Sequence, residues 1–239
     1  MQLLKYILKR LGYTIVVLFG VSVLTFSLLQ LTPGSPAQLM LSDGATEEQI
    51  RAKEIEMGLD KPLITQYVNY ISGVVRGDLG ESFFYNMPNS TLIMQRLPAT
   101  GYLTVVAMII ALVISIPLGV IAGVKRGTVV DLIAMVFALL GQSISGVVLG
   151  LVFILIFAVN LGLLPAMGYG GLAFVIMPAT SLAMQMAALL TRMLRSGMVD
   201  VLQEDYITST YAKGISRETI IMKYALRNAI LPVITVIGL

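Results

Sequence analysis

The sequence EDYITSTYAKGISRETIIMKYALRNAILP occupies residues 204–232 and is the longest polar interval in the second half of an otherwise apolar chain. Just before and within it, Met198, Leu202 and Tyr206 recur every four residues, which predicts a first amphipathic helix. Gly214 follows where a helix commonly ends in a residue of left-handed conformation. The stretch therefore predicts two short amphipathic helices joined by a glycine.

The second of these helices is expected to begin after Ser216. A serine is a favourable N-cap, and Glu218 would lie in the first turn, near the positive end of the helix dipole. Ile220 and Tyr224 mark its apolar face. Two interpretations remain open on these residues alone: a hairpin that lies on a membrane surface with its basic side toward lipid headgroups, or a surface for a partner protein.

The spacing within the stretch adds a family resemblance. AKG at 212–214 is followed by nine residues and then by YALRNAILP at 224–232. This closely resembles the cytoplasmic coupling loop (the EAA loop) of binding-protein-dependent ABC importer permeases, in the branch that carries dipeptides, oligopeptides, glutathione and nickel. The positions in register are Asp205, Tyr206, Ile207, Ala212, Lys213, Gly214, Ala225, Leu226, Arg227, Asn228, Ala229 and Pro232.

The resemblance has two departures and a wide extent. Residues 208–210 are Thr-Ser-Thr where the wider superfamily has Glu-Ala-Ala, and Tyr224 stands in place of the usual His. Further strings similar to the same branch are LTPGSPA (31–37), GLDKPLITQY (58–67), GDLGES (77–82) and RLPAT (96–100). Because these strings follow one another in family order, the resemblance covers nearly the whole chain.

Composition independently indicates a membrane protein. The 239 residues are 57% hydrophobic and only 12% charged, with a net charge of +3. The chain has no Cys and no His, which argues against disulfides, thiolate chemistry and imidazole catalysis. The basic residues are scattered around apolar runs, so we expect no nucleic-acid partner, and we expect no metal or cofactor site.

The apolar runs and their flanking charges predict a topology with a cytoplasmic N-terminus. The first run is too long for the apolar core of a signal peptide and is followed by no small-x-small cleavage pattern, so we expect it to remain uncleaved. The expected order is a cytoplasmic segment (1–10), span one (11–31), an extracytoplasmic segment (32–98), span two (99–124), a cytoplasmic loop (125–131), span three (132–159), an extracytoplasmic loop (160–171), span four (172–191), the cytoplasmic coupling loop (192–228) and the start of span five (229–239).

Charge agrees with this arrangement. The expected extracytoplasmic segment at 32–98 carries eight acidic and five basic residues, whereas the cytoplasmic segments together carry eleven basic and five acidic ones. Within 32–98, short helices are expected from Thr46, as N-cap, to Met57 and from Gln66 to Val75. The fold class is thus an all-α, polytopic integral membrane protein. The resemblance implies a helical bundle of the type I ABC importer permease, truncated within its fifth transmembrane helix.

Three polar residues in the expected spans are candidates for a translocation pathway: Gln142, Ser143 and Gln185. A carboxamide in the middle of a membrane costs free energy unless it meets a partner or water. Helix packing through small residues explains the serine equally well. The two glutamines are therefore the stronger pathway candidates.

The resemblance implies a function and a set of partners. The chain would be a permease subunit of an ATP-driven importer, with a second homologous permease, two cytoplasmic ATPase subunits and an extracytoplasmic binding protein. The residues implied in coupling to the ATPases are Asp205, Tyr206, Ala212, Lys213, Gly214, Arg227 and Asn228. The chain has no G-x-x-x-x-G-K-[ST] motif, so ATP must be bound by another subunit.

Two alternatives to the importer would require other residues. A stand-alone secondary transporter or channel would be expected to carry a charged residue inside a span for ion coupling, and the four expected spans have none between their ends. An intramembrane hydrolase needs His or paired Asp residues, and we expect no buried Asp in any span. The absence of an acidic or His cluster also favours a peptide substrate over a bare metal ion.

Overall fold

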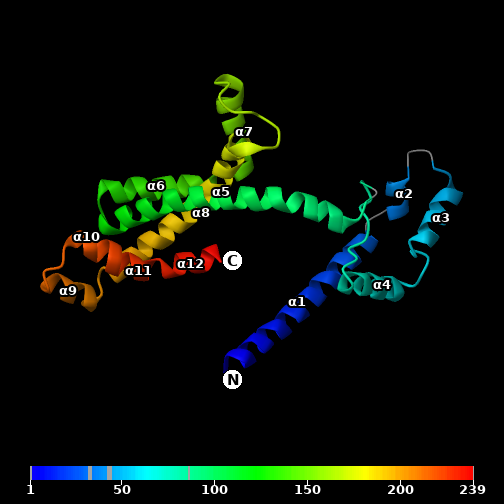
Figure 1. The fold of residues 1–239 in the computed structure, drawn as a ribbon, viewed down its shortest axis with the longest axis horizontal. Helices are drawn as coiled ribbons and strands as arrows, with labels where there is room; N and C mark the ends of the chain where they lie inside the picture. The colour runs from blue at the N-terminus through cyan, green and yellow to red at the C-terminus, as the bar shows by residue number, and fades with distance from the viewer. Residues whose placement is uncertain (1, 32–33, 42–44, 86, 239) are drawn as a thin grey trace. The chain divides into compact units, whose positions relative to one another are not determined.

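The structure is a computed structural model that describes residues 2–31, 34–41, 45–85 and 87–238, and it is built from helices (Figure 1). It divides into two compact units, an N-terminal unit, Met1–Leu97, and a C-terminal unit, Pro98–Leu239. The only β-bridge among the described residues is the isolated pair Glu81 and Pro88. The all-α fold class is therefore confirmed.

The N-terminal unit contains α1 (Gln2–Leu31), α2 (Pro36–Met40), α3 (Glu47–Glu56), α4 (Leu63–Val75) and the first turns of α5 (Asn89–Val124). Helix α3 begins as predicted, because the Thr46 hydroxyl accepts a hydrogen bond from the Gln49 amide and the Gln49 side chain accepts one from the Thr46 amide. Helix α4 begins three residues before the predicted Gln66 and ends at the predicted Val75. Its N-terminal residue follows Pro62, which serves as N-cap.

Helix α4 contacts α1 through one aromatic residue. The Tyr67 ring meets Phe26 edge-on with centroids 5.4 Å apart, and its hydroxyl lies 2.8 Å from the Ser22 hydroxyl. Gln30 donates a 3.0 Å hydrogen bond to Gln66 beside this contact. The rest of α1 is exposed along its described length, although most of its side chains are apolar.

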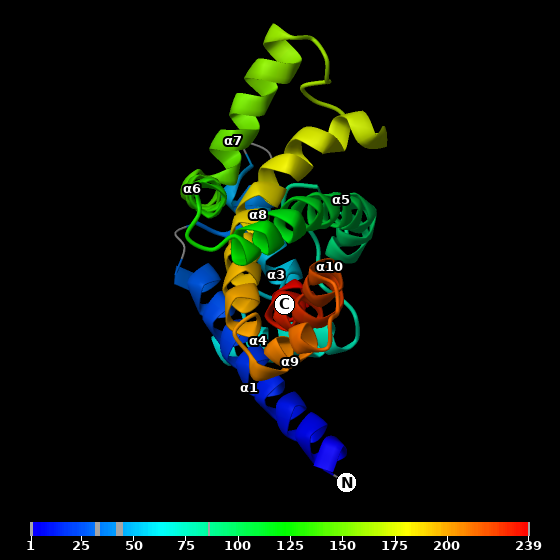
Figure 2. The same cartoon turned by 90° about the vertical axis from the view of Figure 1, so that its left-hand side faces the viewer.

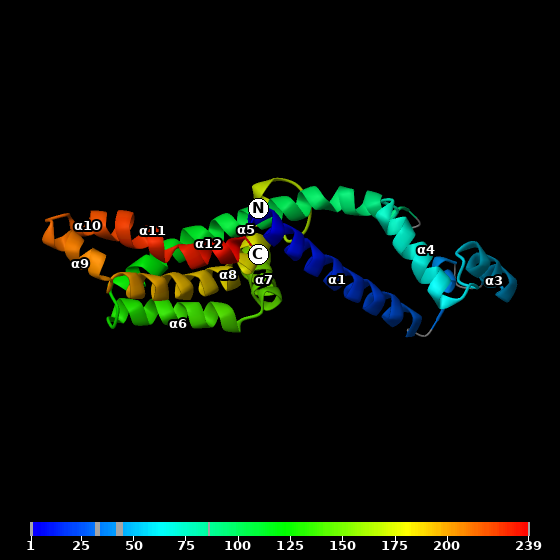
Figure 3. The same cartoon turned by 90° about the horizontal axis from the view of Figure 1, so that it is seen from below.

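The C-terminal unit is arranged around α8 (Gly171–Val201), which packs against helices that precede and follow it in the chain. The preceding elements are the remainder of α5, α6 (Val129–Ser143), α7 (Gly146–Phe153) and the π-helix η1 (Ile154–Asn160). The following elements are α9 (Asp205–Ala212), α10 (Arg217–Thr219), the π-helix η2 (Ile220–Ala225), α11 (Leu226–Ala229) and α12 (Leu231–Ile237). Figure 3 shows α6 on one side of α8 and α11 and α12 on another.

Small residues let α5 approach α8 closely. Ala107 and Ala111 of α5 share a buried cluster with alanines of α8. A methyl group added at Gly119 would lie 2.8 Å from Cβ of Leu194, and one added at Gly123 would lie 2.5 Å from Cβ of Met198. The spacing of these two glycines by four residues in the second expected span predicts such a close helix approach, and the structure confirms it.

The third apolar run differs from expectation. The sequence predicts one span over 132–159, but the helix breaks after Ser143, and α6 and the α7–η1 pair meet at 97°. Figure 2 shows α7 turning away from the line of α6. Ile144 and Ser145 have extended ψ angles of 125° and 135°, which end the helical hydrogen-bond series. Ser143, Ser145 and Gly146 lie at the break, and their low helix propensity reduces the free energy lost when the helix is interrupted there.

Length and composition make several helices able to cross a membrane. Three single helices qualify, namely α1 over Leu4–Leu31, α5 and α8. Two further spans are possible if each bent pair, α6 with α7–η1 and residues 217–229 with α12, forms one span. The described residues thus hold three to five candidate spans.

Candidate functional site

The stretch at 204–232 folds as a helical hairpin at one end of the C-terminal unit (Figures 1 and 3). Helix α9 ends at Ala212 with Lys213 as its C-cap, and Gly214 follows with φ +75°. This is the left-handed residue that the sequence predicts after the first helix, so the prediction of a glycine joint is confirmed. The chain then enters α10, whose N-cap is Ser216 as predicted.

The predicted register of the first helix is wrong. Helix α8 continues to Val201, a turn follows at residues 202–204, and α9 starts only at Asp205. Met198 and Tyr206 therefore do not share one helix, and the residue of α9 that enters the core is Ile207, 1% exposed, whereas Tyr206 is 39% exposed. Acidic residues favour helix N-termini, which is consistent with a new start at Glu204 and Asp205.

The second half of the hairpin contains a π turn that sets its buried face. Ile220, Ala225, Ala229 and Val233 are buried and pack in one cluster, with a spacing of five residues and then four. A π-helix bonds residue i to i+5, so it aligns Ile220 with Ala225. Tyr224, predicted to share a face with Ile220, packs against the cluster only as a partly buried residue.

The backbone of the hairpin packs directly against the backbone of α8. A methyl group added at Gly197 would lie 2.8 Å from the carbonyl oxygen of Ala229, so α11 and α8 touch without an intervening side chain. Leu190, Leu194 and Met198 of α8 complete the buried cluster beneath the hairpin. The hairpin and α8 are therefore in direct contact, through both backbone and side chains.

The residues implied in coupling lie on the opposite, exposed side of this hairpin. Those exposed are Asp205, Tyr206, Ala212, Lys213, Gly214, Arg227 and Asn228. Two of them meet directly, because the Asn228 side-chain amide donates a 2.7 Å hydrogen bond to the Tyr206 hydroxyl. This bond ties α9 to α11, although 22 residues separate its partners.

The predicted pathway residues gather at the break between α6 and α7. The Gln185 side chain of α8 donates a 3.3 Å hydrogen bond to the carbonyl oxygen of Ile144, a group that the break leaves without a helical partner. The Ser143 hydroxyl bonds the carbonyl oxygen of Leu139 at 2.8 Å. Gln142, one residue before Ser143, is exposed.

One ion pair was not anticipated from the sequence. Asp131 lies in the first turn of α6, is 5% exposed, and accepts hydrogen bonds from Nε and Nη2 of Arg195 in α8 at 3.0 and 2.7 Å. Asp131 is the last residue of the expected cytoplasmic loop at 125–131, so it does not test the expectation that no span carries a buried Asp, although α6 already begins at Val129. An acidic residue directly before an apolar run was the available signal.

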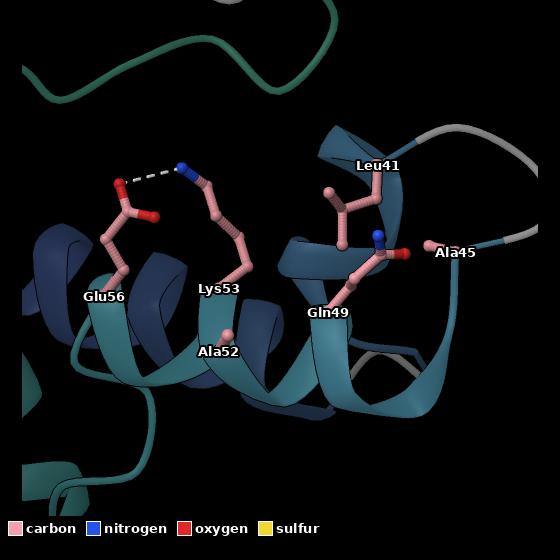
Figure 4. A pocket seen from close by; sticks show the side chains of 6 residues that line it. All are labelled: Leu41, Ala45, Gln49, Ala52, Lys53 and Glu56. Carbon is pink, nitrogen blue, oxygen red and sulfur yellow. Dashed lines mark hydrogen bonds and ion pairs between the residues drawn. The ribbon is translucent and has the colours of Figure 1, made fainter.

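The N-terminal unit has a small groove of about 380 Å³ between α2 and α3 (Figure 4). Lys53 and Glu56 form a 3.0 Å ion pair at its edge, and Gln49 lies on the same face of α3. An exposed pair of this kind contributes little to stability. No group of three or more potential metal-ligating residues occurs among the described residues.

Comparisons with known proteins place the chain in context. Residues 115–239 match the family model described as "Binding-protein-dependent transport system inner membrane component", and residues 3–104 match the model of the N-terminal part of such components. The glutathione transport system permease protein GsiC of Escherichia coli K12 is 38% identical over 237 residues, which is 99% of this chain and 78% of that protein. The dipeptide transport system permease protein DppB of Lactococcus lactis is 37% identical over 237 residues, 99% of this chain and 77% of that protein.

Proposed function

Because the chain belongs to the family of binding-protein-dependent transport system inner membrane components, and is thus a permease subunit of an ABC importer, we propose that residues 204–232 couple it to the ATPase subunits. The chain is a multi-pass inner membrane protein and is not itself catalytic. Its family works with a binding protein and with ATPases. Family membership also decides against a stand-alone secondary transporter.

The observation that carries the coupling proposal is the two-sided construction of the hairpin. One side is buried on α8, with α11 touching α8 backbone to backbone at Gly197. The other side exposes the seven residues implied in coupling, two of which, Tyr206 and Asn228, are joined by a hydrogen bond. A partner that binds the exposed side would therefore act on α8 through both the backbone contact and the buried side-chain cluster.

The partners proposed in more detail are a second homologous permease, two cytoplasmic ATPase subunits and an extracytoplasmic binding protein. The N-terminus would lie in the cytoplasm, as would 125–131 and the coupling loop at 192–228, because these segments carry the excess of basic residues. Segments 32–98 and 160–171 would face outward. Transport would follow alternating access, with closure of the ATPase pair displacing the hairpin and opening the spans outward.

The substrate we propose is a dipeptide, an oligopeptide or glutathione. This rests on the relatives, which are permeases of glutathione and dipeptide systems. The sequence has no His and no Cys, side chains that commonly bind nickel, and this supports an organic substrate over a bare metal ion. Gln142, Ser143 and Gln185 at the helix break are the proposed pathway residues.

The assembly is tested by purification of a tagged chain from detergent-solubilised membranes of its own cell. We expect two P-loop ATPases and a second permease to be recovered with it. Recovery of a lone protein that still imports substrate into liposomes would contradict the proposal. Import would be assayed with glutathione, with dialanine and with pentaalanine, so that each proposed substrate class is tested separately.

The coupling surface is tested at Gly214, where a substituent meets no atom within 4 Å but the φ of +75° opposes most side chains. Gly214→Trp should abolish import while ATP hydrolysis continues, because the indole blocks the partner. Gly214→Asn is the matched control, since Asn tolerates the left-handed region. Equal import by the two variants would argue against docking at this surface.

The pathway is tested by cysteine accessibility in a chain that is naturally free of cysteine. Gln142→Cys should react with a membrane-impermeant thiol reagent in at least one nucleotide state. Leu140→Cys, on the opposite face of α6 and 57% exposed, serves as the matched control. Labelling of Gln142→Cys no faster than Leu140→Cys in every state would contradict a water-filled pathway at the break.

A further inference from the structure

The ion pair between Asp131 and Arg195 has a geometry that fixes orientation as well as distance. Two parallel bonds, Nε to Oδ1 at 3.0 Å and Nη2 to Oδ2 at 2.7 Å, hold the guanidinium and the carboxylate in one plane. The Gly127 amide donates a further 3.0 Å bond to Oδ2. Helix α6, the loop that precedes it and α8 are thereby joined at a single carboxylate.

Burial makes this junction hard to open. Asp131 is 5% exposed and the Arg195 side chain is 27% exposed, so separating them would leave a charge with little access to water. Breaking a buried pair is strongly unfavourable for this reason, whereas an exposed pair opens readily. The pair at Lys53 and Glu56, with a glutamate side chain 67% exposed, is of the second kind.

The position of the junction on α8 is the second observation. Arg195 lies two residues before Gly197, where the backbone of α11 touches α8. A methyl group at Gly123 of α5 would meet the carbonyl oxygen of Arg195 itself at 3.2 Å. One turn of α8 is therefore in contact with α5, α6 and the hairpin together.

We propose that the Asp131–Arg195 pair is a positioning tie that makes the start of α6 move as one body with α8 and the coupling hairpin. The inference rests on the proposed role of residues 204–232. The hairpin transmits its displacement to α8 at Gly197, and the ion pair passes it to α6 and to the loop at 125–128. Without the tie, α8 would slide past α6, and the break at Ile144 would not follow the ATPases.

The chemistry of the pair predicts which substitutions the tie tolerates. Lysine keeps the charge of Arg195, but its ammonium group lacks the planar pair of N–H donors. It therefore cannot form the two parallel hydrogen bonds to the carboxylate oxygens. Asparagine at 131 keeps the shape of the side chain but removes its charge. Exchange of the two residues, Asp131→Arg with Arg195→Asp, keeps both charges and the ability to form two parallel hydrogen bonds.

The test measures a distance within the assembled importer. Spin labels are placed at Val129→Cys on α6 and Asp200→Cys on α8, both exposed positions of a cysteine-free chain. We expect the same narrow distance distribution with and without ATP. With Asp131→Asn or Arg195→Lys, the distribution should broaden or shift by about 2 Å or more on ATP binding, the scale of a helix slide. The exchanged pair should restore the narrow distribution.

Transport provides the second readout. An ion pair that only stabilises the fold would leave transport unchanged in complexes that assemble. Import of glutathione or dialanine per ATP hydrolysed should fall severalfold in the single variants and recover with the exchanged pair. Arg126→Gln removes an exposed charge from the same loop and should change neither quantity. If the single variants do not assemble, the apolar pair Asp131→Leu with Arg195→Met keeps the site filled without charge and should show the same slide.

The outcomes separate the tie from the coupling proposal. Failure to recover ATPases with the chain contradicts the coupling proposal. A distribution that changes with ATP in the unmodified chain, or one that stays narrow in assembled single variants, contradicts the tie alone.

Discussion

Helices α1 and α8 are nearly equal in length, 30 and 31 residues, yet they are built for different neighbours. Within its own unit, α1 is exposed along its described length and contacts α4 at one aromatic patch. Many buried residues of α8 are Ala, Ser or Thr, and these small side chains, together with Gly197, let other helices pack closely against it. Overall apolarity thus identifies a candidate span, whereas small residues at helical spacing identify the helix that organises a bundle.

The strongest way to test this difference is to truncate one leucine on each helix. Leu194 on α8 is 1% exposed, and Leu194→Ala should lower the free energy of unfolding by about 2–5 kcal/mol through lost contacts and a cavity. Leu18 on α1 is 62% exposed, and Leu18→Ala should change stability by less than about 1 kcal/mol. Thermal unfolding in detergent, followed by far-ultraviolet circular dichroism, measures both; equal losses would remove the distinction between the helices.

A smaller effect is expected from methyl groups added to glycines. At Gly123 the added carbon would meet Cβ of Met198 at 2.5 Å, so α5 and α8 must separate, at a cost of about 1–3 kcal/mol. At Gly20 of α1 nothing lies within 4 Å, and Gly20→Ala should be neutral or stabilising by up to about 1 kcal/mol. A stabilising Gly123→Ala would show that the two helices are not in close contact.

The smallest expected effect concerns the contact between α1 and Tyr67 of α4. Tyr67→Phe keeps the edge-on contact with Phe26 but removes the 2.8 Å bond to Ser22, which should cost about 0.5–1.5 kcal/mol. Ser22→Ala removes the same bond from the other side and serves as the matched change. If the double variant loses no more than either single one, the bond alone accounts for the effect.

Local chemistry in the sequence predicted several features of the fold. The cap at Thr46, the left-handed Gly214 and the close approach at Gly119 and Gly123 each depend on one or two residues and their immediate neighbours. Long apolar runs likewise identified α1, α5 and α8 as candidate spans. Such signals are short-range, so a single sequence carries them in full.

Features set by contacts between distant segments were missed. No proline marks the break at Ile144 in the sequence. The carbonyl oxygen of Ile144 accepts a hydrogen bond from Gln185, 41 residues away. The pairing of Asp131 with Arg195 spans 64 residues. The start of α9 at Asp205 interrupted an apolar periodicity that looked continuous through Met198 and Tyr206, because the chain turns there to place Ile207 in the core.

The π turn at Ile220–Ala225 has a consequence for protein engineering. Its wider turn brings Ala225 under the hairpin while leaving Arg227 exposed. If the same six residues formed an ordinary α-helix, everything after them would be rotated by about 100° relative to the residues before them. A chimaera that borrows this segment for another permease must therefore preserve the π turn as well as the number of residues between Gly214 and Pro232.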